Sequence, residues 1–251
     1  MTAISGTMQR NHEQLLHGVA SALEHTDPEL AGYFDRWAFG EVLREGSLEE
    51  SLRLMVQLAA LVACQAIGEY RVVLGSALDA GVTPVEVKEI VYQTVPYVGM
   101  GKVFDFLHAT NDVFRSRGIT LPLQGQSTTT PQTRQAEGLA IQKRLFGDSI
   151  DAMVAQSPQD QRHIQHFLSA NCFGDHYTRA GLDLKTRELL TFAMLAALGG
   201  CEGQVAAHVA GNLAIGNDRQ VLIDVLTQLL PSIGYPRTLN AMRVINDCTS
   251  A

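Results

Sequence analysis

The stretch "GNDRQVLIDVLTQLLPSIG" at residues 216–234 repeats an earlier one, "GVTPVEVKEIVYQTVPYVG" at residues 81–99. Both begin and end with glycine, and two further residue types fall in the same places: Gln93 with Gln228, and Pro96 with Pro231. In the later stretch the apolar residues recur at helical spacing. Each stretch therefore predicts one amphipathic helix.

Capping residues mark where these two helices begin. In the first stretch Thr83 precedes Pro84, and proline is favoured at the first position of a helix. In the second, either Asn217 or Asp218 can accept hydrogen bonds from the free N–H groups of the first turn. Each proline further along, at 96 or 231, is expected at the end of its helix.

Shorter matches extend the repeat over most of the chain. They are "FGEVLREG" at 39–46 with "FGDHYTRAG" at 173–181, "QLAAL" at 57–61 with "MLAAL" at 194–198, and "ND" at 111–112 with 246–247. We interpret this as a duplication into domains 1–120 and 121–251, joined through the polar stretch 117–133. No alternating apolar and polar run is long enough for a sheet, so the fold class is all-α.

Composition excludes several classes of protein. The 251 residues are 46% hydrophobic and 18% charged, as in a folded globular protein. The net charge is −7 with no basic cluster, so nucleic acid is not an expected partner. The most apolar stretch, 52–68, is interrupted by Arg53 and is read as a buried helix rather than a membrane span. Residues 1–16 hold no apolar run typical of a signal peptide, so a cytoplasmic location is expected.

Metal and dithiol sites are not expected either. The four cysteines are scattered and no Cys-x-x-Cys occurs. His163 and His166 stand three residues apart, with His176 further on, but no carboxylate or cysteine pattern completes a metal site.

The stretch "CEGQVAAH" at 201–208 carries the residues that point to chemistry. Cys201 and His208 are seven residues apart, close to two helical turns, with Gln204 between them. All three are expected on one face of a helix that starts after Gly199 and Gly200. A thiol beside an imidazole indicates either redox or acid–base work, or two ordinary helix residues.

Three segments resemble the carboxymuconolactone decarboxylase family, which includes the alkylhydroperoxidase D-like proteins. They read "GLDLKTRELLTFAMLAALGG" at 181–200, "AAHVAGNLAIGN" at 206–217 and "IGYPRTLNAMRVIND" at 233–247. "RQAEGLAIQKRLFGD" from Arg134 also resembles the run that precedes the family's core. The resemblance implies a duplicated alkylhydroperoxidase D-like helical domain and cofactor-free chemistry on a small molecule. It also implies a homo-oligomer, here a trimer of fused pairs.

The family's two branches differ at the Cys201 segment. The peroxidase branch has Cys-x-x-Cys-x-x-x-His, and Gln204 stands here where its attacking cysteine would be. The decarboxylase branch keeps the histidine with glutamates before it. The resemblance thus implies His208 as the proton donor, with Glu188 or Glu202 as its partner.

Three further residues are proposed to bind substrate. Arg187 or Arg243 is proposed to hold a carboxylate of the substrate, and Gln204 is assigned to the binding site. In the first copy the position of His208 falls on Arg71 or Val73, and that of Glu188 on Ser51. That copy is therefore predicted to be mainly structural, with Glu69, Tyr70 and Arg71 lining a different pocket.

Several interpretations stay open at this point. The leading function is decarboxylation of a small carboxylated lactone; the alternatives are a single-cysteine peroxidase using Cys201 and a non-catalytic oligomeric scaffold. Cys201 is also read as a small buried residue, His208 as a core histidine bonded to a carbonyl, and Glu188 as a surface partner of Lys185. An oligomer is expected because residues 52–63 are apolar on all sides and must be covered.

Overall fold

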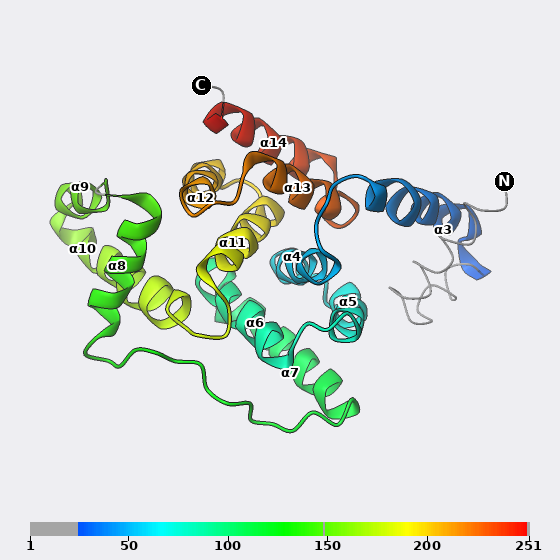
Figure 1. Cartoon of the computed structure of the whole chain (residues 1–251), viewed down its shortest axis with the longest axis horizontal. Helices are drawn as coiled ribbons and strands as arrows, with labels where there is room; N and C mark the ends of the chain where they lie inside the picture. Colours follow the sequence, from blue (N-terminus) through cyan, green and yellow to red (C-terminus); the bar gives the residue numbers. More distant parts are fainter. Residues whose placement is uncertain (1–24, 148, 250–251) are drawn as a thin grey trace.

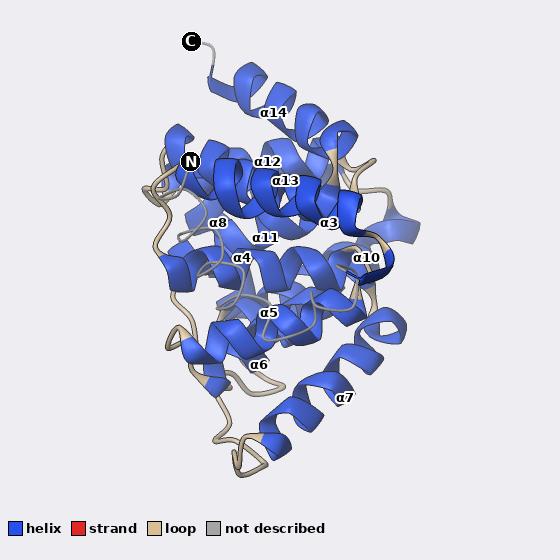
Figure 2. Cartoon of the chain, turned by 90° about the vertical axis from the view of Figure 1, so that its right-hand side faces the viewer, coloured by secondary structure: helices blue, strands red, loops and turns tan. Residues whose placement is uncertain are grey.

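The computed structural model describes residues 25–147 and 149–249 of the chain. All of the regular elements in these residues are helices, with loops between them and no strand (Figure 2). The prediction of an all-α fold is therefore confirmed. None of the helices in the described ranges is long and apolar enough to cross a membrane. The opening stretch 1–16, in which no leader pattern was found, lies outside the described residues.

Four consecutive helices of the first half, within residues 50–116, recur in the same order in the second half, within residues 184–249. The first half contains α3 (Pro28–Phe34), η1 (Asp35–Glu41), η2 (Val42–Arg44), α4 (Glu50–Ala63), α5 (Ile67–Asp79), α6 (Pro84–Val98) and α7 (Met100–Ser116). The second half contains α8 (Arg134–Phe146), α9 (Ser149–Gln156), η3 (Gln159–Gln161), α10 (Arg162–Phe167), η4 (Leu168–Tyr177), α11 (Leu184–Leu198), α12 (Glu202–Ala214), α13 (Arg219–Ile233) and α14 (Tyr235–Thr249). The elements η1 and η4 are π-helical, and η2 and η3 are 3₁₀ turns.

Local signals in the sequence explain where the helices begin. Thr83 and Glu86 form a reciprocal capping box at the start of α6, with Pro84 at its first position. At the start of α13 the side chain of Asp218, one of the two candidate caps, accepts a hydrogen bond from the Val221 N–H. Asn217 is instead buried and donates to the Lys185 carbonyl.

The break between α11 and α12 falls where the two glycines predicted it. Gly199 and Gly200 have φ angles of 68° and 70°, a left-handed conformation that side chains with a Cβ rarely adopt. α11 ends at Leu198 and α12 begins at Glu202, with Cys201 as its N-cap residue. The turn brings α12 back against α11.

Helices α4 and α11 lie side by side at the centre of the molecule (Figure 1). α4 also packs against α5, α6 and α13, and 10 of its 14 residues are buried. The apolar stretch 52–63 is thus covered within the chain. The burial of this helix therefore gives no reason to expect a partner subunit, because helices of its own copy and of the other copy cover it together.

The two halves exchange equivalent contacts, as elements related by a pseudo-twofold axis do. Gly46 of the first half packs against Asp224 of the second, and Gly181 of the second half packs against Glu89 of the first. The same 135 residues separate Gly46 from Gly181 and Glu89 from Asp224. The duplication read from the sequence therefore appears as reciprocal packing in space.

The predicted joint, 117–133, runs between α7 and α8 without helix and crosses the lower edge of the molecule in Figure 1. It is tied to the second half by three hydrogen bonds. Thr128 Oγ1 donates to the Thr178 carbonyl, Thr129 Oγ1 to the Gly174 carbonyl, and the Ala180 N–H to the Gln126 carbonyl. The joint is thus fixed along the second half of the chain by these hydrogen bonds.

Candidate functional site

His208 and Glu188 form a buried pair between α12 and α11. The His208 Nδ1 atom lies 2.8 Å from Glu188 Oε2. Glu188 is fully buried, and His208 is 7% exposed. An ionised carboxylate only accepts hydrogen bonds, so the pairing places a proton on Nδ1. The other ring nitrogen, Nε2, has no hydrogen-bond partner among the described residues and is the atom left for chemistry.

Two tyrosines extend this pair. The Tyr177 hydroxyl donates to Glu188 Oε1 at 2.7 Å, and the Tyr97 hydroxyl donates to the Tyr177 oxygen at 3.1 Å. Burial raises the pKa of both tyrosines well above 10, and the nearby Glu188 raises each further. Both hydroxyls therefore stay protonated and act as donors, which stabilises the carboxylate beside His208.

The site is shared by the two copies of the domain. Tyr97 comes from α6 of the first copy, and its ring meets the His208 ring edge-on at 6.2 Å. The ring of Phe146, at the end of α8, also meets the His208 ring edge-on, at 5.4 Å. Sequence reasoning missed all three residues. Tyr97 reaches His208 only through the contact between copies, and Tyr177 and Phe146 reach the site through the packing of η4 and α8 within the second copy.

Asn212 fixes α12 against α11 next to this pair. Its side-chain amide donates to the backbone carbonyls of Glu188 at 3.1 Å and of His208 at 2.7 Å. Gly211 leaves the room that the carboxylate occupies, because a Cβ there would lie 2.7 Å from Glu188 Oε2. Asn212 thus fixes α12 against α11, and Gly211 leaves space for the Glu188 side chain, so that His208 and Glu188 can meet.

The segment that begins at Arg134 forms α8, which packs closely against η4 and also against α12. A Cβ at Gly138 of α8 would lie 1.9 Å from the Ser169 carbonyl oxygen, and one at Gly174 of η4 would lie 2.1 Å from the Arg134 carbonyl oxygen. Only glycines permit so close an approach of α8 and η4. This packing places Phe146 and Tyr177 beside His208.

Cys201 is separate from the His208 pair. Seven residues of helix separate them by about 10 Å along the axis, and none of the described contacts joins them. The Cys201 thiol is half-buried and donates to the Leu195 carbonyl. Burial raises its pKa, and the nearby Glu202 raises it further. Glu202 is half-buried, and Gln204 is exposed.

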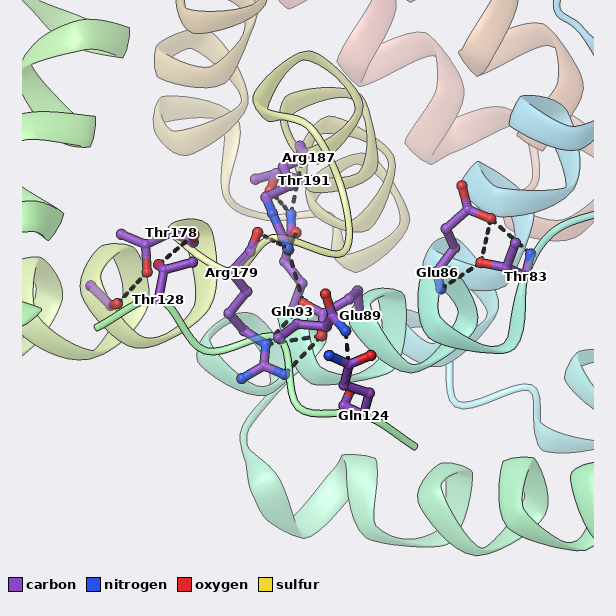
Figure 3. A network of polar contacts seen from close by, with 12 residues as sticks. Thr83, Glu86, Glu89, Gln93, Gln124, Thr128, Thr178, Arg179, Arg187 and Thr191 are labelled. Atoms are coloured by element: carbon purple, nitrogen blue, oxygen red, sulfur yellow. Dashed lines mark hydrogen bonds and ion pairs between the residues drawn. The ribbon is translucent and has the colours of Figure 1, made fainter. Parts of the chain in front are cut away.

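Arg187 is not available to a substrate, contrary to the sequence-based hypothesis. Its guanidinium is fully buried and donates to Glu89 Oε2, Gln93 Oε1 and the Arg179 carbonyl at 2.8–2.9 Å (Figure 3). Its role in the described structure is to join α11 of the second copy to α6 of the first. Arg243, the other candidate, is exposed on α14.

A continuous buried polar chain runs from this arginine to His208. Gln93 accepts from Arg187 and donates to Thr191 Oγ1 at 3.0 Å. Thr191 is hydrogen-bonded to Tyr177, which donates to Glu188. The chain satisfies polar groups that would otherwise be costly to bury at the contact between copies.

The three histidines of the second copy do not converge. No group of three or more His, Cys, Asp or Glu residues placed to hold a metal ion occurs in the described part of the chain. His163 and His166 are exposed. His176 is half-buried, its Nδ1 has no hydrogen-bond partner among the residues that the structure describes, and burial lowers its pKa to about 4.

The first copy lacks the carboxylate–histidine pair at the equivalent place. α5 and α12 begin after residues 135 apart, Ala66 and Cys201, so His208 corresponds to Val73 rather than Arg71. The last residues of α4 and α11 are also 135 positions apart. Glu188 therefore corresponds to Arg53, and its predicted match to Ser51 was wrong.

The residues expected around a pocket in the first copy separate in the structure. Glu69 lines a cavity together with Arg53 and Val73. Tyr70 is instead fully buried against Thr110, and Arg71 pairs with Asp112 at the surface.

Comparison with known proteins agrees with this duplicated arrangement. The model of the carboxymuconolactone decarboxylase family matches the chain twice, at residues 28–112 and 162–247. The 4-carboxymuconolactone decarboxylase of Acinetobacter baylyi (strain ATCC 33305 / BD413 / ADP1) is 29% identical over 97 residues. That alignment covers 39% of this chain and 72% of the relative.

Proposed function

Because the chain belongs to the carboxymuconolactone decarboxylase family, with two copies of the domain, we propose that it is a cofactor-free decarboxylase of a small carboxylated lactone such as 4-carboxymuconolactone. The observation that carries the proposal is the buried contact of His208 with Glu188. A relative named for this activity supports the choice of substrate class.

His208 is proposed to deliver the proton that the reaction needs. As the C–C bond to the carboxylate breaks, carbon dioxide leaves and the electron pair moves into the conjugated lactone. The carbon that receives this electron density takes a proton from His208 Nε2, and solvent returns the proton to the histidine. The Glu188 carboxylate stabilises the imidazolium and orients the ring through Nδ1.

The substrate-binding assignments remain proposals. Gln204 on α12 and Arg243 on α14 both present exposed side chains, and α14 packs against α12. We assign a polar contact with the lactone to Gln204 and a contact with its carboxylate to Arg243. Glu202 remains a second carboxylate at the start of α12.

The test is steady-state turnover of 4-carboxymuconolactone by the full chain and two variants. His208→Ala is expected to lower kcat by about 10²–10⁴-fold, the usual contribution of a positioned proton donor. Cys201→Ser is expected to change kcat little, since the thiol does not touch His208. Far-UV circular dichroism of both variants verifies the fold.

The same variants separate the two alternative functions. A single-cysteine peroxidase would lose peroxide reduction in Cys201→Ser and keep it in His208→Ala. The raised pKa of the Cys201 thiol argues against this activity, because the thiolate is the reactive form. Absence of turnover with lactones and peroxides alike would support a non-catalytic scaffold.

A further inference from the structure

A second cavity lies between α6, α7, the joint and Arg179, apart from the His208 site. Its volume is about 380 Å³, enough for a small organic molecule. Its polar lining consists chiefly of Lys88, Glu89, Asn111, Arg115, Gln124 and Arg179. Tyr92 and the leucines of the joint add apolar surface.

The charge of this lining is opposite in sign to that of the chain. The whole protein carries −7, whereas three cations and one carboxylate line the cavity. The carboxylate, Glu89, is already engaged by two arginines. Arg179 donates to it at 2.8–2.9 Å, and Arg187 donates at 2.9 Å from the buried side (Figure 3). The cavity thus keeps an excess of positive charge.

Lys88 is the least compensated of these cations. It is 8% exposed, and its ammonium donates to the neutral Asn111 Oδ1 at 2.6 Å. It has no carboxylate within ion-pair distance among the residues that the structure describes. Burial lowers its pKa, and the positive charge of Arg115 lowers it further. A buried charge without a counter-ion is costly unless a ligand supplies one.

The rings around this ammonium compensate only part of that cost. The Lys88 Nζ atom lies 5.9 Å from the Tyr92 ring centroid and 5.8 Å from that of Phe114. Arg179 lies over the Tyr92 ring as well, at 5.3 Å. The Tyr92 ring is therefore in contact with both Lys88 and Arg179, and it contributes apolar surface to the cavity beside them.

This lysine is not a shared feature of the two copies. The position 135 residues after Lys88 is Ile223 on α13. The joint that closes the cavity also occurs only once in the chain. The cationic cavity is thus a property of the fused molecule and not of the single domain.

We propose that this cavity binds a small organic anion through a carboxylate or phosphate group. Lys88 supplies the principal counter-charge, and Arg115, which is also paired with Asp112 at 3.2 Å, supplies a second one. Tyr92 and the apolar side chains of the joint, Leu121 and Leu123, cover the body of the ligand. The joint is then part of a binding site as well as a connection.

The test is calorimetric titration of the full chain with three probes: inorganic phosphate, succinate and benzoate. We expect at least one to bind, and Lys88→Met to weaken that binding at least tenfold. Lys102→Met, which removes an exposed lysine of α7 outside the cavity, is the matched control and should bind as the parent does. Binding that depends on Lys88 supports the site, and the tighter probe identifies the head group.

A second variant keeps the test decisive if Lys88→Met folds poorly. Arg115 is exposed, so Arg115→Gln is expected to fold and to weaken binding severalfold. Failure of all three probes to bind at millimolar concentration would overturn the proposal. Equal binding by the parent and by either cavity variant would do the same. No arm of this test depends on lactone turnover.

Discussion

At the scale of single residues, Gly211 makes the His208 site sterically possible. A Cβ at this position would lie 2.7 Å from Glu188 Oε2 and 3.1 Å from a ring carbon of Phe146. Gly211→Ala is therefore expected to displace the carboxylate and to destabilise the protein by about 1–3 kcal/mol, as overpacking does. Chemical denaturation measures the stability, and lactone turnover should fall with it.

Gly203→Ala is the matched control on the same helix. No atom lies within 4 Å of a Cβ at Gly203, and the residue is exposed. Removing this glycine from α12 should leave stability unchanged or raise it by at most about 1 kcal/mol. If both variants behaved alike, the space beside Glu188 would not be the reason for glycine at 211.

The resemblance of the sequence to its family identified His208 and Glu188, but the geometry around them required the fold. Glu188 is not a surface partner of Lys185, and His208 pairs with a carboxylate instead of a carbonyl. The part played by Tyr97 was not predictable, because it lies 111 residues before His208 and reaches it only where the copies meet. In the same contact the Arg187 guanidinium is bound to Glu89. Nothing in the local sequence indicated that this cation would be unavailable to a substrate.

At the scale of elements, the π-helical segment η4 carries a histidine with an acid-sensitive environment. Burial lowers the pKa of His176 from 6.5 to about 4, and within the described ranges its Nδ1 has no hydrogen-bond partner. Between these two values the unfolded chain binds a proton that the folded chain does not. Stability from this group is thus present above pH 6.5 and is lost as pH falls towards 4.

Replacing His176 with leucine is expected to remove this part of the pH dependence. From the two pKa values, the parent should lose about 2 kcal/mol between pH 8 and pH 5 through His176 alone. His176→Leu should lose that much less over the same range, measured by urea unfolding. His163→Leu, at an exposed position, is the control and should follow the parent. Identical pH profiles for parent and His176→Leu would contradict the assignment.

The ends of helices were predictable where a capping residue or a glycine stands at the boundary. The capping box at Thr83, the cap at Asp218 and the stop at Gly199 are local features, so the sequence contains them in full. The π-helical form of η1 and η4 was not predicted. In η4 it accompanies the close approach to α8 at Gly138, which is a tertiary contact.

At the scale of the whole molecule, both copies leave apolar side chains exposed at the same places. Met100 and Phe104 are exposed on α7, and Tyr235 and Leu239 are exposed on α14. Each residue of the second pair follows its counterpart by 135 positions. Among the described residues the fusion covers α4 and α11 but leaves these side chains exposed, although Trp37 stacks on the Tyr235 ring at 6.0 Å. Since a ring of fused pairs would use an equivalent surface from every domain, these are the surfaces that a trimer would bury.

The prediction that the chain is not a monomer therefore rests on α7 and α14. Sedimentation equilibrium at micromolar concentration is expected to give a species of three chains of 27.3 kDa each. Phe104→Glu combined with Leu239→Glu should dissociate it, because a charge on each surface must lose its water when the surfaces meet. Gln161→Glu adds a charge at an exposed site on η3 and should leave the assembly intact. A stable 27.3 kDa species in the parent protein would show that these surfaces stay uncovered.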